Sequence, residues 1–191
     1  MSAGSMVLLD SYTVSGTPAT VTIGGGTGGS SSSNVVIDST YNFYVISITN
    51  VKCSTDDRDL YFRVTKSGDG TASAVAEYDY AADNHKSNSD TGSSYAAGQT
   101  AWLHNADASN SPSEESINGF IYPLNFQDST NFSYAIFDIV GTTDPGGTAN
   151  TRSFTGGGTH TVGEVNDGMQ FYWSSSATFS AGNFKLYGLI K

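Results

Sequence analysis

The chain has 191 residues, of which 14% are charged and 12% are aromatic, and 18 acidic against 8 basic residues give a formal net charge of −10. An acidic surface repels phosphate backbones, so nucleic acid is not expected as a partner. Low charge with many aromatic residues is also unlike the composition of disordered chains. The length suits one all-β domain, 1–191, and no shift in composition suggests a boundary.

The first half of the chain shows short apolar runs separated by turn residues. In 41–50, Tyr44, Ile46 and Ile48 would share one face of a strand, and in 59–66 apolar residues also alternate with polar ones. Glycine, serine, threonine and asparagine fill the gaps, as turns require. The segments in this half that predict strands are 5–14, 19–23, 41–50, 59–66 and 74–80.

The second half continues this pattern with strands at 117–126, 132–140, 168–176 and 182–191. Pro123 predicts an edge strand or a bulge, because proline lacks the backbone donor that a central strand uses. The run "FSYAIFDIV" (132–140) is apolar on both faces, which favours a central strand. We expect the last two strands to form a hairpin in which Met169, Phe171 and Trp173 share the core with Phe184, Leu186 and Ile190. Eight or nine such strands predict an antiparallel β-sandwich of the jelly-roll kind.

Three polar segments are expected to be loops. The stretch "GGGTGGSSSSN" (24–34) predicts a flexible linker or surface loop, because glycine and serine give a chain little stiffness. The segment 82–116 is long for a compact domain and predicts a contact surface. The segment 141–159 contains two glycine clusters and a "DPGG" turn.

Motifs that carry chemistry are weak. Gly24, Gly26 and Gly29 match the spacing of a dinucleotide loop, but no helical pattern follows them. The histidines His85, His104 and His160 show no metal-binding spacing, and Cys53 stands alone in a strand-like run. No run approaches the length of a membrane span, and "SMVLLDSY" lacks the basic flank of a signal peptide. We therefore expect no catalytic residues, cofactor, metal or membrane.

Four aromatic residues in or beside the long loop are the candidate contact residues: Tyr78, Tyr80, Tyr95 and Trp102. Tyrosine and tryptophan combine a flat apolar face with a polar group, which suits protein interfaces and sugar rings alike. The same residues could instead pack in the core of the sandwich. The sequence leaves core packing, a protein interface and a glycan site open.

Several segments together resemble a family of small virion structural proteins of tailed phages, common in marine and cyanobacterial phage genomes. They are "VLLDSYTVSGTPATVTI", "DSTYNFYVISITNVK", "INGFIYPLNF" and "DGMQFYWSSS…GNFKLYGLIK". The resemblance covers roughly residues 6–66 and 117–191 and consists of strand patterns without a catalytic signature. It implies a jelly-roll-like sandwich assembled on a phage particle.

From this resemblance we expect a non-enzymatic virion protein, assembled in the host cytoplasm and placed on the outer surface of the particle. The first hypothesis is a decoration or cement protein that binds the major capsid protein or another virion protein, with residues 1–9 as an anchoring arm. A homotrimer is the expected oligomer, since many jelly-roll virion proteins are built that way. The alternative is a tail-fibre or head-fibre module that recognises a host surface glycan near Tyr95 and Trp102.

Overall fold

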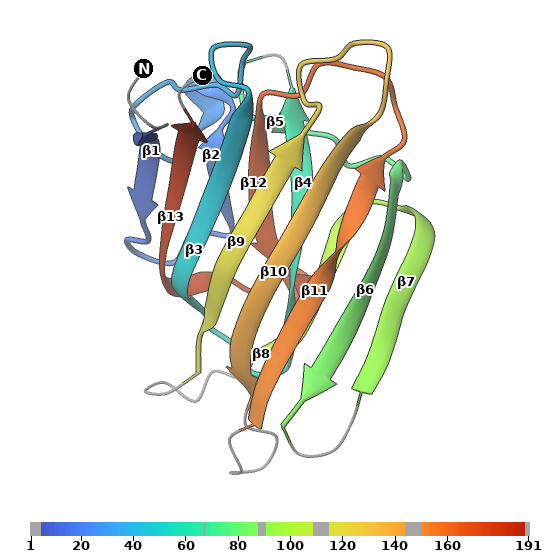
Figure 1. The fold of residues 1–191 in the computed structure, drawn as a ribbon. Coiled ribbons are helices and arrows are strands. Elements are labelled where there is room, and N and C mark those ends of the chain that lie inside the picture. Colours follow the sequence, from blue (N-terminus) through green and yellow to red (C-terminus); the bar gives the residue numbers. More distant parts are fainter. Residues whose placement is uncertain (1–4, 67, 88–90, 109–114, 144–149, 190–191) are drawn as a thin grey trace.

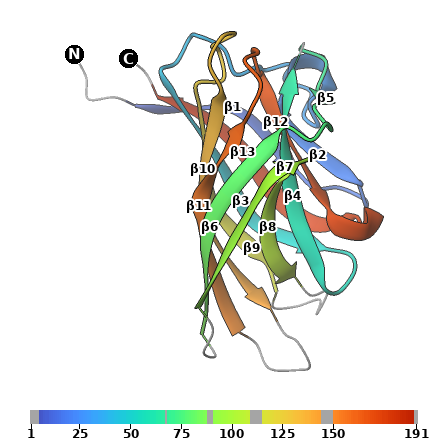
Figure 2. The ribbon, with the colours of Figure 1, turned by 90° about the vertical axis from the view of Figure 1, so that its right-hand side faces the viewer.

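The chain folds into two antiparallel β-sheets that pack face to face (Figure 1). The computed structural model describes residues 5–66, 68–87, 91–108, 115–143 and 150–189. Figure 2 shows the two sheets from the side as separate layers. The predicted β-sandwich is confirmed, whereas the prediction of eight or nine strands is wrong, because the described residues form 13.

The larger sheet has eight strands, which lie in an order different from that of the sequence. Across the sheet, the strands are β1 (Met6–Thr13), β13 (Phe179–Leu189), β3 (Phe43–Cys53), β9 (Ile117–Leu124), β10 (Ser133–Thr143), β11 (Asn150–His160), β6 (Tyr78–Lys86) and β7 (Thr91–Gln99).

The smaller sheet has five strands and covers the inner face of the larger one. Two short 3-10 helices, Gly26–Gly28 and Ser174–Ser176, lie outside the sheets. The strands of the smaller sheet are, in order, β2 (Thr20–Gly24), β12 (Gly168–Trp173), β4 (Arg58–Lys66) and β5 (Thr71–Ala72), with β8 (Trp102–Ala108) also pairing with β4.

The strands β12 and β13 do not form the expected hairpin. Strand β12 pairs with β2 and β4, while β13 pairs with β1 and β3 in the other sheet. The two strands still share the core, because their inward side chains meet across it. The rings of Phe171 and Phe184 are 5.1 Å apart, and those of Trp173 and Phe179 are 5.5 Å apart. Ile190 lies outside the described residues.

The central position predicted for 132–140 is confirmed, since β10 is the fifth of eight strands. Strand β9, beside it, is also internal, so the edge position suggested by Pro123 is wrong. Proline is tolerated there because the register between β3 and β9 reaches only to the pair Ile46–Ile121, two residues before Pro123. The backbone donor that proline lacks is not needed beyond that pair.

The two long segments expected to be loops contain three of the strands that sequence patterns missed. Strands β7 and β8 lie within 82–116, and β11 begins within 141–159 and ends one residue beyond it. Their residues are mostly small and polar, and β11 carries three consecutive glycines, Gly156 to Gly158. Such residues have low strand propensity, so the pairing with neighbours decides their conformation.

Trp102, the first residue of β8, fills the space between the sheets where the smaller sheet is narrow. It is 0% exposed, and its ring lies 5.1 Å from that of Tyr78 and 5.8 Å from that of Phe62. The indole Nε1–H donates to the backbone oxygens of Asp79 (3.2 Å) and Thr159 (3.3 Å). A Cβ at Gly158 would lie 2.2 Å from Nε1, so a glycine is required opposite this tryptophan.

The segment 24–34, expected to be flexible, is held in place by the buried carboxylate of Asp10. Asp10 accepts hydrogen bonds from Gly24 N (3.1 Å) and Ser33 Oγ (2.6 Å), and also from Ser31 Oγ. The expected arm 1–9 is, from Met6 onward, part of the edge strand β1. Residues 1–4 lie outside the described part of the chain.

Replacing Trp102 with alanine should lower the free energy of unfolding by about 3–5 kcal/mol, because the substitution leaves a large cavity. Chemical denaturation followed by circular dichroism measures the change. As a control, Val75→Ala changes a side chain that is 60% exposed and should shift the free energy by less than about 0.5 kcal/mol. Equal effects of the two substitutions would contradict a core role for Trp102.

Candidate functional site

The structure separates the four candidate aromatic residues instead of gathering them on one surface. Tyr78 and Trp102 are both 0% exposed, so of the three alternatives these two residues follow core packing. Tyr80 is half-buried and packs against the core. Tyr95 is 78% exposed and lies on β7 at the edge of the larger sheet. A platform for a sugar made of Tyr95 and Trp102 is therefore not present.

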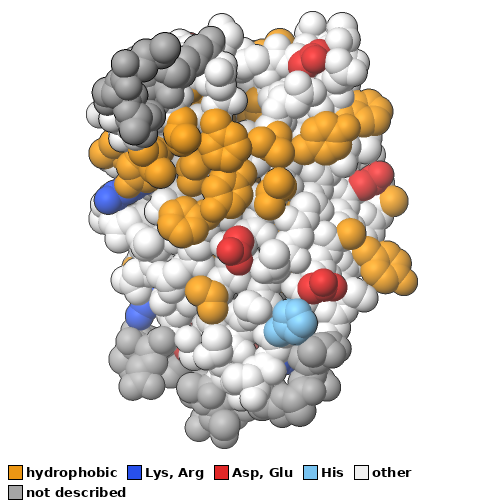
Figure 3. Space-filling view, viewed as in Figure 1, with side chains coloured by type: hydrophobic (Ala, Val, Ile, Leu, Met, Phe, Trp, Pro, Cys, Tyr) orange, Lys and Arg blue, Asp and Glu red, His pale blue; other side chains and the backbone are white. Residues whose placement is uncertain are grey.

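The outer face of the larger sheet carries a band of apolar side chains, which Figure 3 shows gathered over the left and middle of the face, with white atoms between them and the apolar side chains at the right edge. We call it the outer apolar band. Several of its large side chains are more than 40% exposed. The band consists of Met6, Leu8, Tyr187, Leu189, Phe43, Phe120, Tyr122, Leu124, Tyr134, Ile136, Ala81 and Tyr95, with the buried Val45 and with Gly157, which has no side chain, in the same rows.

The strand register explains how the residues of the band line up across the sheet. Directly paired residues of antiparallel strands point to the same face. Leu8 pairs with Tyr187 and Tyr187 with Val45, and the pair Ile46–Ile121 places Val45 beside Tyr122. The same row continues from Tyr122 to Ile136, Gly157, Ala81 and Tyr95 on the remaining four strands. One register row thus presents an uncharged residue on every one of the eight strands.

The next register row toward one end of the strands is largely polar. Its members, in sheet order, are Ser11, Lys185, Ser47, Phe120, Asp138, Thr155, Asp83 and Ser93. Asp138 accepts a hydrogen bond from Thr155 Oγ1 at 3.1 Å. Within the described residues, neither the Lys185 ammonium nor the Asp83 carboxylate has a hydrogen-bond or ion-pair partner. The band therefore has one free charge of each sign beside it, on opposite halves of the sheet.

The two halves of the band differ in height. On β3 and β9, aromatic rings gather, with Phe43 and Phe120 at 5.9 and 6.5 Å from Tyr122. On β10, β11 and β6, there is instead a shallow hollow of about 510 Å³, lined by Ile136, Gly157 and their neighbours. Gly157 has no side chain to fill it. A Cβ there would have a single neighbour within 4 Å, the backbone oxygen of Ala135 at 3.3 Å.

Such a face is suited to contact with another protein. Single exposed apolar side chains are ordinary on monomers, but contiguous apolar patches mark interaction sites. Ile136 is 48% exposed, Phe120 is 47% exposed and Tyr134 is 43% exposed, and all three lie on neighbouring strands. Aromatic side chains with a polar rim are typical of protein interfaces.

The sequence of strand β10 already contains a signal for this band. The run 132–140 is apolar on both faces, which favours a central strand and also supplies apolar side chains to the outer face. In the structure, Ala135, Phe137 and Ile139 are buried, whereas Tyr134 and Ile136 are exposed. A strand that is apolar on both faces indicates either a sheet covered on both sides within the chain or a sheet whose outer face binds another protein.

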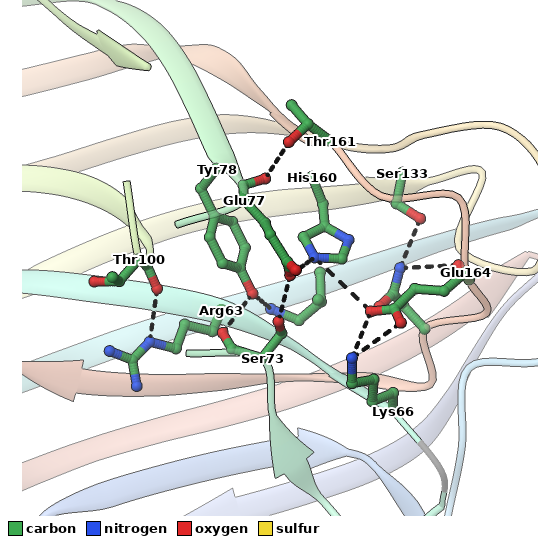
Figure 4. A network of polar contacts seen from close by, with 12 residues as sticks. Arg63, Lys66, Ser73, Glu77, Tyr78, Thr100, Ser133, His160, Thr161 and Glu164 are labelled. Atoms are coloured by element: carbon green, nitrogen blue, oxygen red, sulfur yellow. Dashed lines mark hydrogen bonds and ion pairs between the residues drawn. The ribbon is translucent and has the colours of Figure 1, made fainter. Parts of the chain in front are cut away.

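A second cluster, of polar residues, joins the two sheets at the ends of β4, β6 and β11 (Figure 4). His160 Nε2 lies 3.2 Å from Glu77 Oε2 and 3.9 Å from Glu164 Oε1. Because a carboxylate can only accept, Nε2 carries the proton and donates to Glu77. Lys66 Nζ donates to both oxygens of Glu164, at 3.0 and 2.9 Å. Glu77 also accepts from Ser73 Oγ at 2.8 Å.

The protonation states in this cluster follow from burial. His160 is 0% exposed, and burial lowers the pKa of His160 below its ordinary value of 6.5, although Glu77 and Glu164 oppose this shift. Partial burial acts to raise the pKa of Glu77, but the hydrogen bonds from Ser73 and His160 outweigh it, so that this pKa is lowered. We therefore describe His160 as neutral at pH 7 and Glu77 as a carboxylate.

The ligand atoms of Glu77, His160 and Glu164 lie within 4.8 Å of one another, which is a spacing that a divalent cation could use. The ammonium of Lys66 already neutralises Glu164 at direct contact, and repulsion from it disfavours a metal ion there. We interpret the cluster as a cross-link between the sheets. Of the other histidines, His85 lies on β6, and the side chain of His104 lies outside the described residues.

Comparison of the chain with protein-family models, with curated proteins and with solved structures finds no match. Within the residues that the structure describes, no helix is long and apolar enough to cross a membrane.

The state of His160 predicts how stability depends on pH. Because folding lowers the pKa of His160, the unfolded chain binds more protons just below pH 6.5. The free energy of unfolding should therefore fall as the pH falls through the ordinary histidine value of 6.5, until the lowered pKa of the folded chain is passed. Glu77, with its lowered pKa, adds a loss only near its ordinary value of 4.5.

Thermal unfolding of the native chain and of His160→Gln across this pH range measures the effect. Glutamine keeps a donor for Glu77 and does not titrate. The variant should have a flatter dependence on pH below 6.5, whatever its absolute stability. A slope as steep as that of the native chain would contradict a neutral, buried His160.

Proposed function

We propose that this chain is a non-enzymatic virion structural protein, most of all a decoration or cement component on the outside of a phage capsid. The observation that carries the proposal is the outer apolar band, whose rows extend over all eight strands of the larger sheet. An apolar surface of this extent is suited to a protein that works through contact with other protein chains. The resemblance of the strand segments to phage virion proteins supplies the setting.

Other features support this proposal. The chain crosses repeatedly between the two antiparallel sheets, for example at β1–β2, β2–β3, β3–β4 and β12–β13, as the strands of a β-sandwich do. A net charge of −10 favours a position away from packaged DNA. In this proposal the host cytoplasm is the place of assembly, and the major capsid protein is the partner. The trimer expected from the resemblance is not tested by the structure, and a trimer and a dimer are alternatives.

A non-catalytic role agrees with the chemistry of the polar cluster. Its histidine is closed off from solvent, and its carboxylates are engaged by Ser73, His160 and Lys66. A general base or a nucleophile needs a substrate within hydrogen-bond reach. The glycan-binding alternative has less support, because burial of Tyr78 and Trp102 leaves Tyr95 as the one strongly exposed aromatic residue of the four candidates.

The test is the number of copies per purified virion, measured by quantitative mass spectrometry against the major capsid protein. Icosahedral shells repeat a surface site many times, so a decoration protein should be present in copies on the order of hundreds. About a dozen copies or fewer would place the chain at a tail or a vertex and favour the fibre hypothesis. Complete absence from the particle would contradict a structural role.

A further inference from the structure

We propose that the outer apolar band is a homodimer interface, in which a second copy of this chain lies face to face with the first. The inference rests on the proposed function only in that both assign the band to protein contact. The two-fold axis lies parallel to the strands, between β9 and β10, the fourth and fifth of the eight strands. The band crosses this axis, so each register row meets its own copy.

After the two-fold rotation, large side chains of the band in one copy lie opposite small ones in the other. The second strand from one edge, β13, faces the second strand from the other edge, β6, and β3 faces β11. Tyr187 then lies opposite Ala81, and Val45 lies opposite Gly157. The raised aromatic half of one copy therefore covers the hollow of the other. Isologous interfaces require such a match between two different parts of one surface.

The hollow has room for the side chains that it would receive. A cavity of roughly 150 Å³ holds a benzene ring. The hollow beside Ile136 and Gly157 measures about 510 Å³, which is enough for an aromatic ring from the opposite copy. A Cβ at position 157 would make one tight contact, 3.3 Å from the Ala135 backbone oxygen, whereas Gly158 has no room for a Cβ beside Trp102.

The charges beside the band are also self-complementary. Lys185 on β13 and Asp83 on β6 belong to one register row and lie on strands that the two-fold axis brings together. Each is unpaired within the described part of the chain, and the dimer pairs them twice. Packed sheets cross at about 30°, which displaces these two strands, about 12 Å from the axis, by about 6 Å relative to each other, roughly the length of a lysine side chain.

The area is sufficient for a stable pair. Seven strand spacings of about 4.8 Å make the band about 34 Å long, and three outward rows make it about 20 Å deep, which gives on the order of 700 Å² per copy. Specific interfaces cover about 800 Å² per partner. The central row carries no charge, whereas the two rows beside it carry Lys185 and the carboxylates Asp79, Asp83 and Asp138.

The first experiment fills the hollow. Analytical ultracentrifugation of the native chain over a wide concentration range should show a species of twice the 20.0 kDa chain mass. Gly157→Val suits a strand and should raise the dimer dissociation constant at least about tenfold. Thr151→Val, on the same strand and face but three rows away, is the control and should leave the constant unchanged. Circular dichroism of each variant confirms the fold.

The second experiment reverses the charges. Lys185→Glu places like charges opposite each other, as does Asp83→Lys, so each single variant should dimerise more weakly at low salt. The double variant restores both pairs and the native net charge of −10, and it should recover dimerisation. Weak dimerisation of the double variant would overturn the two-fold pairing.

Other outcomes separate this inference from the proposed function. A chain that is monomeric at all concentrations, or a trimer of three times the chain mass, overturns the dimer. If the native chain is monomeric and Gly157→Val loses binding to phage heads that lack the protein, the band contacts the shell, and the proposed function stands. A stable dimer that is absent from virions supports this inference and overturns the proposed function.

Discussion

The packing of Trp102 against β11 is the constraint on which the rest of the molecule depends. A sheet of eight strands has a wide inner face, and a sheet of five strands can cover it only if large side chains fill the gap beside β4. Trp102 does this, and it approaches β11 so closely that position 158 must be glycine. Position 156 is similarly limited, since a Cβ there would lie 2.4 Å from that of Ala82. The glycines at positions 156 and 158 of β11 are thus a consequence of core packing.

The same strand shapes the outer face. Glycines inside a strand weaken it and often mark a close approach of another chain segment. Gly156 and Gly158 face the core, where Ala82 and Trp102 occupy the space. Gly157 faces outward between Ile136 and Ala81, and there it leaves the hollow. The three glycines therefore determine both the packing between the two sheets and the shape of the outer surface on which a partner would lie.

Sequence patterns predicted the elements that alternate strongly and missed those that do not. The segments 41–50, 59–66 and 132–140 contain aromatic or β-branched residues at every second position, and the structure has strands at each. Strands β7 and β11 are rich in small polar residues and glycine, so pairing with neighbours fixes them rather than local preference. The separation of β12 and β13 was missed for another reason: two strands that share a core can lie in one sheet or in opposite sheets, and side-chain alternation is the same in both.

The residues of the candidate surface could be recognised in the sequence, but their alignment into one row could not. Two-sided apolar strands could be recognised, and the aromatic residues of 41–50 and 117–126 lay among the predicted strands. What alternation cannot give is the order of strands in the sheet, and the outer apolar band exists only because that order aligns Tyr187, Tyr122 and Ile136 in one row. Long-range register also decides that Lys185 and Asp83, about a hundred residues apart, share a row. Because a slip of one residue would turn every one of these side chains to the other face, the register that forms the core also fixes the interaction surface.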